Sequence, residues 1–348
     1  METILVLVHT EADGALAKPA REALAAGSTL AEALGGASLA VGLVGAEVQG
    51  AADSIASCGA ARFLGVAGPE FDQSRYATDA LAAEALCRRA GATLIIAPGT
   101  SRWSRALPGA AHRLGGRADT HVAEIAVVDQ TPSVTRWYYR QRIEATTRRA
   151  QRPWMILLDP GSGAAWEGEA GAAAVEPVSV VPPGGDVRTT VIGIQAPPAD
   201  AQTIRPDAEL LFVAGAGWTK VQADGKAHPA EAADLILDFL RKTQASLGGS
   251  KSLVDLSGEG QAVLPFMTHL NQVGQTGSTP RHPKGLTACC HGEEPHTVGW
   301  RFINERRAIN LDPNCGWARG KADVLYVANA FEVMAKVNAL LAERGTKA

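Results

Sequence analysis

Short apolar runs alternate with helical patterns through the first third of the chain. Ile4–Val8 is continuously apolar, which is typical of a strand buried on both faces. In Pro19–Leu34, which follows, Ala, Leu and Glu recur at helical spacing behind a proline suited to a first turn. The same alternation predicts strands at Ser38–Val44, Phe63–Val66 and Thr93–Ala97, and helices at Ala51–Ser57, Tyr76–Arg89 and Arg102–Leu114. We expect Pro108 to break or kink the last helix. This alternation indicates βαβ units and a parallel sheet.

The pattern changes after Val122, where short strand-like runs follow one another without helices between them. These runs are Glu124–Val128, Val134–Tyr139, Ile143–Thr147, Met155–Leu158 and Val178–Val181. We therefore expect a β-rich extension that closes the first domain. Gly161–Gly171, rich in Gly and Ala, is expected to form an exposed loop.

Prolines mark the clearest boundary, between Ala196 and Asp207. A second α/β pattern follows. Its strands are predicted at Leu210–Ala214, Leu286–Cys290, Ala308–Leu311 and Val324–Val327, and its helices at Pro229–Ala245 and Phe331–Leu341. Ala233, Ile236, Leu237 and Leu240 are the expected apolar face of the first of these helices. We predict an N-terminal α/β domain over 1–195, a linker over 196–208 and a doubly wound C-terminal α/β domain over 209–348.

Composition and charge narrow the function classes. The 348 residues carry 33 Lys and Arg against 36 Asp and Glu, a net charge of −3, which disfavours a general nucleic-acid binder. The basic, aromatic run Arg136–Arg142 is better explained as a solvated strand pair or a subunit contact. No apolar stretch reaches about 18 residues, and the N-terminus lacks a basic segment, so neither a membrane span nor a signal peptide is expected.

The cysteines point to a reducing compartment. Their number is five and their spacing is scattered, which argues against a disulfide framework and favours a cytoplasmic protein. Cys289 and Cys290 are adjacent on a predicted strand and therefore point to opposite faces, so a shared metal ion is not expected. No pattern supports a Cys–His nucleophile.

Three polar, glycine-containing segments follow predicted strands or lie between them. Gly215-Ala216-Gly217 lies where open α/β sheets bind ligands, although a tight turn is the better explanation of this segment taken alone. Asn271–Ser278 offers amides, hydroxyls and two glycines, which suit a planar polar ligand or an ordinary turn. His291–His296 is a candidate anion site, but Glu293 and Glu294 oppose that use.

Sequence motifs over nearly the whole chain resemble the α subunit of electron transfer flavoproteins. They are the opening ETILVLVH, the helix PAREALAAGSTLAEAL, and GSKSLVD, NQVGQTGS, PHTVG, AINLDPN and VANAFEVM toward the C-terminus. The resemblance implies a heterodimer in which the α subunit has an N-terminal α/β domain that is mainly structural and contacts the β subunit. The C-terminal domain of the α subunit would bind FAD. The β subunit commonly holds AMP, and a second flavin there is the alternative.

The resemblance also implies which residues contact FAD. They are Ser250, Lys251, Val273, Gly274, Gln275, Thr276, His291, Gly292, His296, Asn310, Asn329 and Ala330. The Thr276 hydroxyl would lie near the flavin N5 atom, and His296 would lie beside the pyrimidine ring. Lys251 and His296 would stabilise negative charge on the reduced ring. Asn329 would lie toward the adenosine side.

Several positions depart from the family. Ala216 and Lys251 stand where the family has arginines, and Lys251 keeps the charge but not the planar, stacking guanidinium. Asn329 replaces an aspartate, and HGEEPH replaces SGAIQH. These departures keep open a flavin-free, nucleotide-binding scaffold with a partner-docking role.

The resemblance makes the chain an electron carrier rather than an enzyme, and no acid–base pair or nucleophile suggests otherwise. Its expected partners are a β subunit, a flavin dehydrogenase that donates electrons and an acceptor such as a quinone oxidoreductase. The sequence does not name the dehydrogenase.

Overall fold

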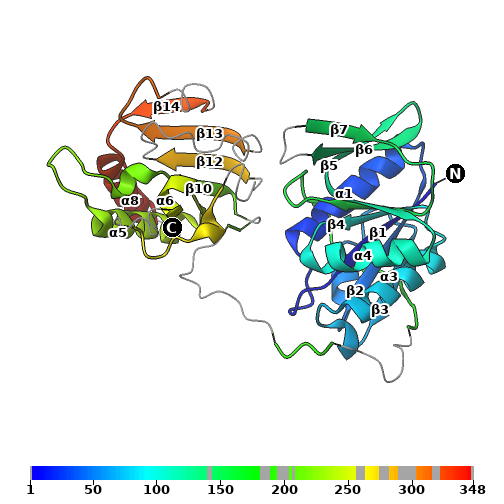
Figure 1. Cartoon of the computed structure of the whole chain (residues 1–348). Coiled ribbons are helices and arrows are strands. Elements are labelled where there is room, and N and C mark those ends of the chain that lie inside the picture. The colour runs from blue at the N-terminus through cyan, green and yellow to red at the C-terminus, as the bar shows by residue number, and fades with distance from the viewer. Residues whose placement is uncertain are drawn as a thin grey trace. The chain divides into compact units, whose positions relative to one another are not determined.

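The computed structural model describes residues 2–138, 143–180, 189–193, 204–205, 208–255, 263–273, 282–288, 303–315 and 322–345. The chain divides into two compact units, residues 1–195 and 196–348 (Figure 1). None of the described helices is long and apolar enough to cross a membrane.

A nine-stranded mixed sheet forms the centre of the first unit. Its strands are β1 (Thr3–His9), β2 (Ser38–Gly45), β3 (Arg62–Ala67), β4 (Leu94–Pro98), β5 (Arg117–Val128), β6 (Thr131–Tyr138), β7 (Ile143–Thr147), β8 (Trp154–Leu158) and β9 (Val175–Pro177). Their order is β7-β6-β5-β8-β4-β1-β2-β3-β9. The β5–β6 and β6–β7 pairs are antiparallel and the other pairs are parallel. The antiparallel strands are the predicted β-rich extension.

Helices cover both faces of this sheet. The helices are α1 (Lys18–Ala33), α2 (Gln49–Asp53), α3 (Tyr76–Ala90) and α4 (Ser101–Arg113). Ala23 and Leu24 of α1 pack with one side of the central strands, and Leu86 of α3 and Leu107 of α4 pack with the other. β1 contributes to both cores because successive strand residues point to opposite faces.

Some predicted details of this unit differ from the structure. Helix α4 continues through Pro108, so the predicted break does not occur there. Leu107 and Ala110 on either side of the proline are fully buried, and their burial outweighs the loss of one backbone hydrogen bond. The last strand is Val175–Pro177 rather than Val178–Val181, and it pairs with β3 from Phe63 to Gly65.

The second unit contains a five-stranded, all-parallel sheet. Its strands are β10 (Leu210–Ala214), β11 (Ser246–Gly249), β12 (His282–Ala288), β13 (Ile303–Asn310) and β14 (Val324–Val327), in the order β11-β10-β12-β13-β14. Helices α5 (Pro229–Thr243) and α8 (Ala330–Gly345) pack against each other on one face (Figure 1). The mixed and the all-parallel sheet together confirm the predicted α/β fold class.

Several details of this unit differ from the prediction. Strands β12 and β13 begin at His282 and Ile303, before the predicted starts at Leu286 and Ala308. β11 was not predicted, because Ser246–Gly249 contains two glycines and only one large apolar residue. Helix α5 buries Ala232, Ile236, Phe239 and Leu240. The predicted Ala233 and Leu237 are partly buried and pack against the same core, so the predicted face is right but omits Ala232 and Phe239.

Candidate functional site

The carboxyl ends of the five C-terminal strands lie at one edge of their sheet, because all the strands are parallel. Ser250 directly follows β11, Asn310 is the last residue of β13, and Asn329 is the second residue after β14. Ligands of open α/β sheets bind outside this edge. We call it the carboxyl edge and examine the predicted residues there.

Ser250, Lys251 and Val273 form one group beside β11. The Ser250 N–H donates to the Ala214 carbonyl at 2.9 Å, which joins the ends of β11 and β10. The Ser250 hydroxyl oxygen accepts a hydrogen bond from the Leu253 N–H at 3.3 Å, within the short helix α6 (Lys251–Asp255). The Val273 N–H donates to the Gly249 carbonyl at 3.0 Å. The start of the predicted Asn271–Ser278 loop therefore lies against the end of β11.

Glycine at position 248 is required for this approach. A Cβ atom at Gly248 would lie 2.8 Å from Cγ1 of Val273, and this branched side chain has little freedom to move away. The glycines that obscured β11 in the sequence thus allow the loop to pack beside it.

Lys251 provides a positive charge next to Ser250, and its side chain is half exposed. Its Nζ atom lies 3.7 Å from a carboxylate oxygen of Asp255, and the other oxygen of that carboxylate lies 3.7 Å from Nδ1 of His269. Asp255 therefore partly balances the lysine charge. The ammonium group remains accessible to solvent or a ligand.

Asn310, Asn329 and Ala330 form a second group at the ends of β13 and β14. The Ala328 N–H donates to the Asn310 carbonyl at 3.2 Å. The side-chain oxygen of Asn310 accepts a hydrogen bond from the Asp312 N–H at 2.9 Å. The side-chain oxygen of Asn329 accepts one from the Phe331 N–H at 2.8 Å, so Asn329 caps the N-terminus of α8.

The ends of β10 and β12 lie between the two groups. Neighbouring strands are about 4.8 Å apart, so the ends of β11 and β13 are roughly 14 Å apart across three strand spacings. A compact ligand cannot contact both groups, whereas an elongated one can.

The segment Gly215–Gly217 packs as a turn. The Gly215 N–H donates to the Ala288 carbonyl at 2.8 Å, and the short 3-10 helix η2 (Ala216–Thr219) follows. Ala216 is only 2% exposed, and Trp218 is fully buried with its ring 4.7 Å from that of Phe331. Position 216 therefore contributes to the core, in agreement with the turn interpretation.

Half of the predicted site residues lie outside the described residues. They are Gly274, Gln275, Thr276, His291, Gly292 and His296. Cys289 and Cys290 also lie outside them, whereas Cys58, Cys87 and Cys315 are buried and form no disulfide bond. In the described parts of the chain, no group of three or more His, Cys, Asp or Glu residues is placed to hold a metal ion.

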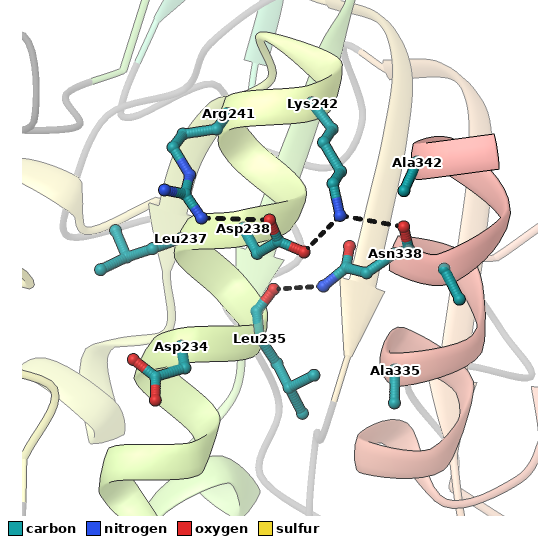
Figure 2. A pocket seen from close by; sticks show the side chains of 10 residues that line it. Asp234, Leu235, Leu237, Asp238, Arg241, Lys242, Ala335, Asn338 and Ala342 are labelled. Carbon is teal, nitrogen blue, oxygen red and sulfur yellow. Dashed lines mark hydrogen bonds and ion pairs between the residues drawn. The ribbon is translucent and has the colours of Figure 1, made fainter. Parts of the chain in front are cut away.

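A groove of about 920 Å³ lies between α5 and α8, but it is separate from the carboxyl edge (Figure 2). It is lined by residues from the middle and C-terminal parts of both helices, whose N-termini are the ends nearer the carboxyl edge. Asp238 pairs with Arg241 and Lys242, and Lys242 also donates to the Asn338 carbonyl at 3.0 Å. These charges satisfy one another along α5, and the Lys242 hydrogen bond links α5 to α8. None of the predicted site residues lines the groove.

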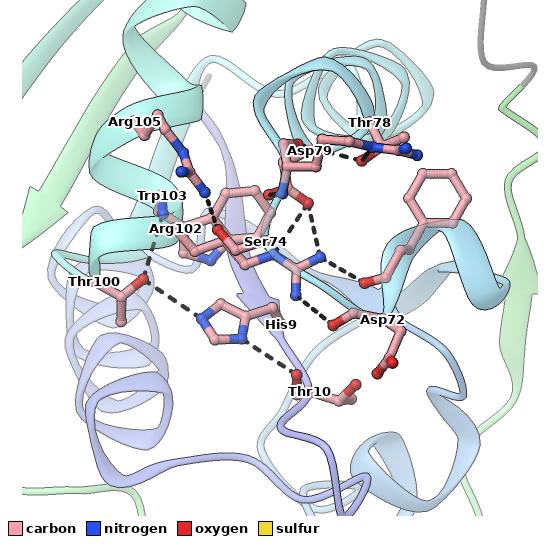
Figure 3. A network of polar contacts seen from close by, with 12 residues as sticks. His9, Thr10, Asp72, Ser74, Thr78, Asp79, Thr100, Arg102, Trp103 and Arg105 are labelled. Atoms are coloured by element: carbon pink, nitrogen blue, oxygen red, sulfur yellow. Dashed lines mark hydrogen bonds and ion pairs between the residues drawn. The ribbon is translucent and has the colours of Figure 1, made fainter. Parts of the chain in front are cut away.

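A second polar network lies at the carboxyl ends of β1 and β4 in the first unit (Figure 3). Arg102 of α4 donates to the Asp79 carboxylate of α3 at 2.7 and 3.0 Å, and to the Phe71 carbonyl at 2.6 Å. His9 lies 3.5 Å from the hydroxyl of Thr100, which caps α4. Burial and the nearby Arg102 guanidinium lower the pKa of His9. Most of these polar groups are hydrogen-bonded to one another. This is consistent with the mainly structural role that the resemblance implies for the N-terminal domain.

Sequence reasoning missed the Asp79–Arg102 pair and Gln222. Asp79 lies on a helix that reads as an ordinary Ala-rich amphipathic segment, so nothing in its spacing marks a buried carboxylate. Gln222 lies in the connection between β10 and α5, in a segment without a recognised motif. Only the folded chain brings Gln222 beside Asn310 and Asn329.

Residues 4–183, a little more than half of the chain, match the family model for the electron transfer flavoprotein domain. No curated protein matches the chain.

Proposed function

Because the chain belongs to the electron transfer flavoprotein domain family, we propose that it is the α subunit of a heterodimeric electron transfer flavoprotein. We further propose that it binds FAD along the carboxyl edge of its C-terminal sheet. The family match lies within the first unit and does not distinguish α from β subunits. The second unit supports the α assignment, because the resemblance implies that an α subunit carries a separate FAD domain.

The observation that carries the proposal is the gathering of Ser250, Lys251, Val273, Asn310, Asn329 and Ala330 at one sheet edge. These residues were predicted from motifs spread over about 80 positions, and the fold brings all six to the carboxyl ends of parallel strands. Their arrangement in two groups suits an elongated dinucleotide.

The chemistry of the described side chains also fits FAD. A hydroxyl and two carboxamides can bind neutral polar atoms, and one exposed ammonium can face negative charge. Bound FAD would supply the redox chemistry, while the chain binds and orients it and sets its electrostatic environment. Ser250 and Val273 would hold the flavin side, Lys251 would favour its reduced, anionic states, and Asn310 and Asn329 would hold the adenosine side.

In this function the chain is an electron carrier and not an enzyme with its own substrate. It would take electrons from a flavin dehydrogenase and pass them to an acceptor such as a quinone oxidoreductase. A β subunit would complete the FAD site and hold AMP or a second flavin.

Co-expression with a β subunit tests the proposal. We expect the two chains to copurify as a yellow complex whose visible absorbance is bleached by dithionite, and the Asn310→Ala/Asn329→Ala variant to retain less FAD. A matched control is Asp234→Ala in the α5–α8 groove, which should retain FAD fully. A colourless complex that cannot be reconstituted with FAD would instead favour the flavin-free scaffold.

A further inference from the structure

The exposed side of helices α5 and α8, with the groove of about 920 Å³ between them, is a surface that the proposed function does not use (Figure 2). On α8 the groove is lined by Ala335, Ala339 and Ala342, and on α5 its apolar residues are Leu235 and Leu237. Alanines spaced by three and four residues lie on one side of a helix, and their small side chains let another helix approach closely. We call this surface the α5–α8 face and ask what packs on it.

Two exposed side chains of opposite charge lie along α5 on this face. Asp234 and Arg241 are seven residues apart, about two helical turns, so they point to the same side of the helix (Figure 2). The Asp234 side chain has no hydrogen bond or ion pair with another described residue. Arg241 is 74% exposed and donates to Asp238 at 3.1 Å, which leaves N–H groups for a further acceptor. Helix α5 therefore presents a negative charge at one end of the groove and a positive charge at the other.

Helix α8 carries the same pattern with the signs reversed. Lys336 and Glu343 are seven residues apart and exposed, and neither side chain pairs with another described residue. The two helices are fixed at one level by Asn338, whose Nδ2 group donates to the Leu235 carbonyl at 2.9 Å and whose carbonyl accepts from Lys242 at 3.0 Å. The midpoints of the two charge patterns thus coincide to within about one helical turn.

Four charges that alternate in this way are complementary to a second copy of themselves. If the copies face each other about a twofold axis across the helices, Asp234 meets Arg241 of the second copy. Lys336 then meets Glu343 of the second copy. If the axis runs along the helices, Asp234 meets Lys336 and Arg241 meets Glu343. Either arrangement brings only opposite charges together, which is the self-complementarity that a twofold interface requires.

We propose that the α5–α8 face binds a second copy of this chain and forms a twofold-symmetric dimer. The alanines and leucines of the groove become its apolar centre, and the four charges form pairs around them. The face is separate from the carboxyl edge, so a complex with a β subunit would contain two copies of each chain. The groove spans only about two turns of each helix, so we expect a weak dimer with a dissociation constant in the micromolar range.

Sedimentation equilibrium measures this association on the complex of the full chain with a β subunit, or on the full chain alone where no β subunit binds. We expect the mass to double as the concentration rises through the micromolar range. Asp234→Lys should weaken the dimer about tenfold or more, because a twofold axis creates each repulsive pair twice. The matched control is Glu305→Lys, an exposed charge reversal on β13, which should dimerise like wild type.

Mixtures of variants identify the contact. Arg241→Glu and Lys336→Glu should each weaken the dimer when alone. Mixing Asp234→Lys with Arg241→Glu restores opposite charges when the axis lies across the helices. Mixing Asp234→Lys with Lys336→Glu restores them when the axis runs along the helices. We expect one of the two mixtures to recover the mass of the dimer.

The inference is overturned by a complex that stays at one α and one β chain up to about 100 μM, well above the expected dissociation constant. A dimer that Asp234→Lys leaves intact, or that Glu305→Lys weakens equally, also overturns it. So does the failure of both mixtures to recover a dimer. Absence of any β subunit binding contradicts the proposed function, and the full chain alone then decides this inference.

Discussion

Lys251 is the residue whose chemistry bears most directly on the proposed redox role. It stands where the family has an arginine, and it keeps the positive charge while sharing Asp255 as a counter-charge at 3.7 Å. Its side chain is 49% exposed, so solvent screening reduces its influence on a bound flavin.

We expect Lys251→Ala to lower the reduction potential of bound FAD. Removing a positive charge disfavours the negatively charged reduced flavin. For a one-electron step, about 59 mV corresponds to roughly 1.4 kcal/mol, and the exposure of Lys251 limits the effect to about that size. A redox titration measures it. Lys251→Arg is the charge-preserving control, and Lys226→Ala, in the connection between β10 and α5, is the remote control. An unchanged potential in Lys251→Ala would remove this lysine from the tuning role.

His9 in the first unit predicts a dependence of stability on pH. Burial and Arg102 lower its pKa, while Glu11 and Asp79 act in the opposite direction. The unfolded chain therefore takes up the proton at higher pH than the folded chain, and stability falls as the pH drops below about 6.5. In urea denaturation, wild type should lose stability relative to His9→Gln between pH 7.5 and 5.5. A difference in unfolding free energy between wild type and His9→Gln that stays constant over this range would contradict the lowered pKa of His9.

At the scale of the elements, α3 and α4 are joined by the buried Asp79–Arg102 pair. Both side chains are almost inaccessible, with exposed fractions of 0% and 6%. Arg102 also donates to the Phe71 and Asp72 carbonyls and so ties the helices to the segment after β3. The pair fixes the geometry of the connections at that end of the first sheet.

Asp79→Asn should destabilise the first unit by about 3–5 kcal/mol, because it leaves a buried guanidinium without its counter-charge. Glu84→Gln on the same helix is the control. It removes the pairs with Arg88 and Arg113, whose side chains are 60% and 34% exposed, and should cost no more than about 1 kcal/mol. Urea denaturation monitored by circular dichroism measures both. Equal losses of unfolding free energy in the two variants would show that the buried Asp79–Arg102 pair contributes no more to stability than the pairs of Glu84.

Gly248 makes a corresponding prediction for the second unit. Gly248→Ala places a Cβ atom 2.8 Å from Val273, so β11 and the loop beside it must separate, at a cost of about 1–3 kcal/mol. FAD retention should fall with it. Gly50→Ala in α2, where nothing lies within 4 Å of the added Cβ, is the control for both readouts. Full FAD retention in Gly248→Ala would contradict the role given to this close approach.

The sequence was most informative where hydrophobic periodicity determines the structure. The run at Leu210–Ala214 and the helical spacing after Pro229 predicted β10 and α5 closely. It was least informative where tertiary contacts decide, as with Pro108 inside α4 and the glycine-rich β11. The same holds for the candidate site. Motifs identified Ser250, Asn310 and Asn329, whereas Gln222 lies beside Asn310 and Asn329 only in the folded chain and belongs to no recognised motif.

At the scale of the whole molecule, the family match and the proposed FAD-binding residues lie in different α/β units. The first unit contains the whole family match, and most polar groups of its Asp79–Arg102 network are hydrogen-bonded within the chain. The second unit carries the described residues proposed to bind FAD. The units have separate hydrophobic cores, so substitutions at the carboxyl edge of the second unit need not disturb the first.

The central claim is that one FAD binds to this chain in a complex with a β subunit. The measurement that tests it most directly is the FAD content of the purified, FAD-reconstituted complex, from the absorbance of the released flavin and the protein concentration. A β subunit that keeps its own flavin would be measured alone and subtracted. We predict one FAD per α chain, with a marked loss in the Asn310→Ala/Asn329→Ala variant. A content near zero, or one FAD that is unaffected by this variant, would contradict the account.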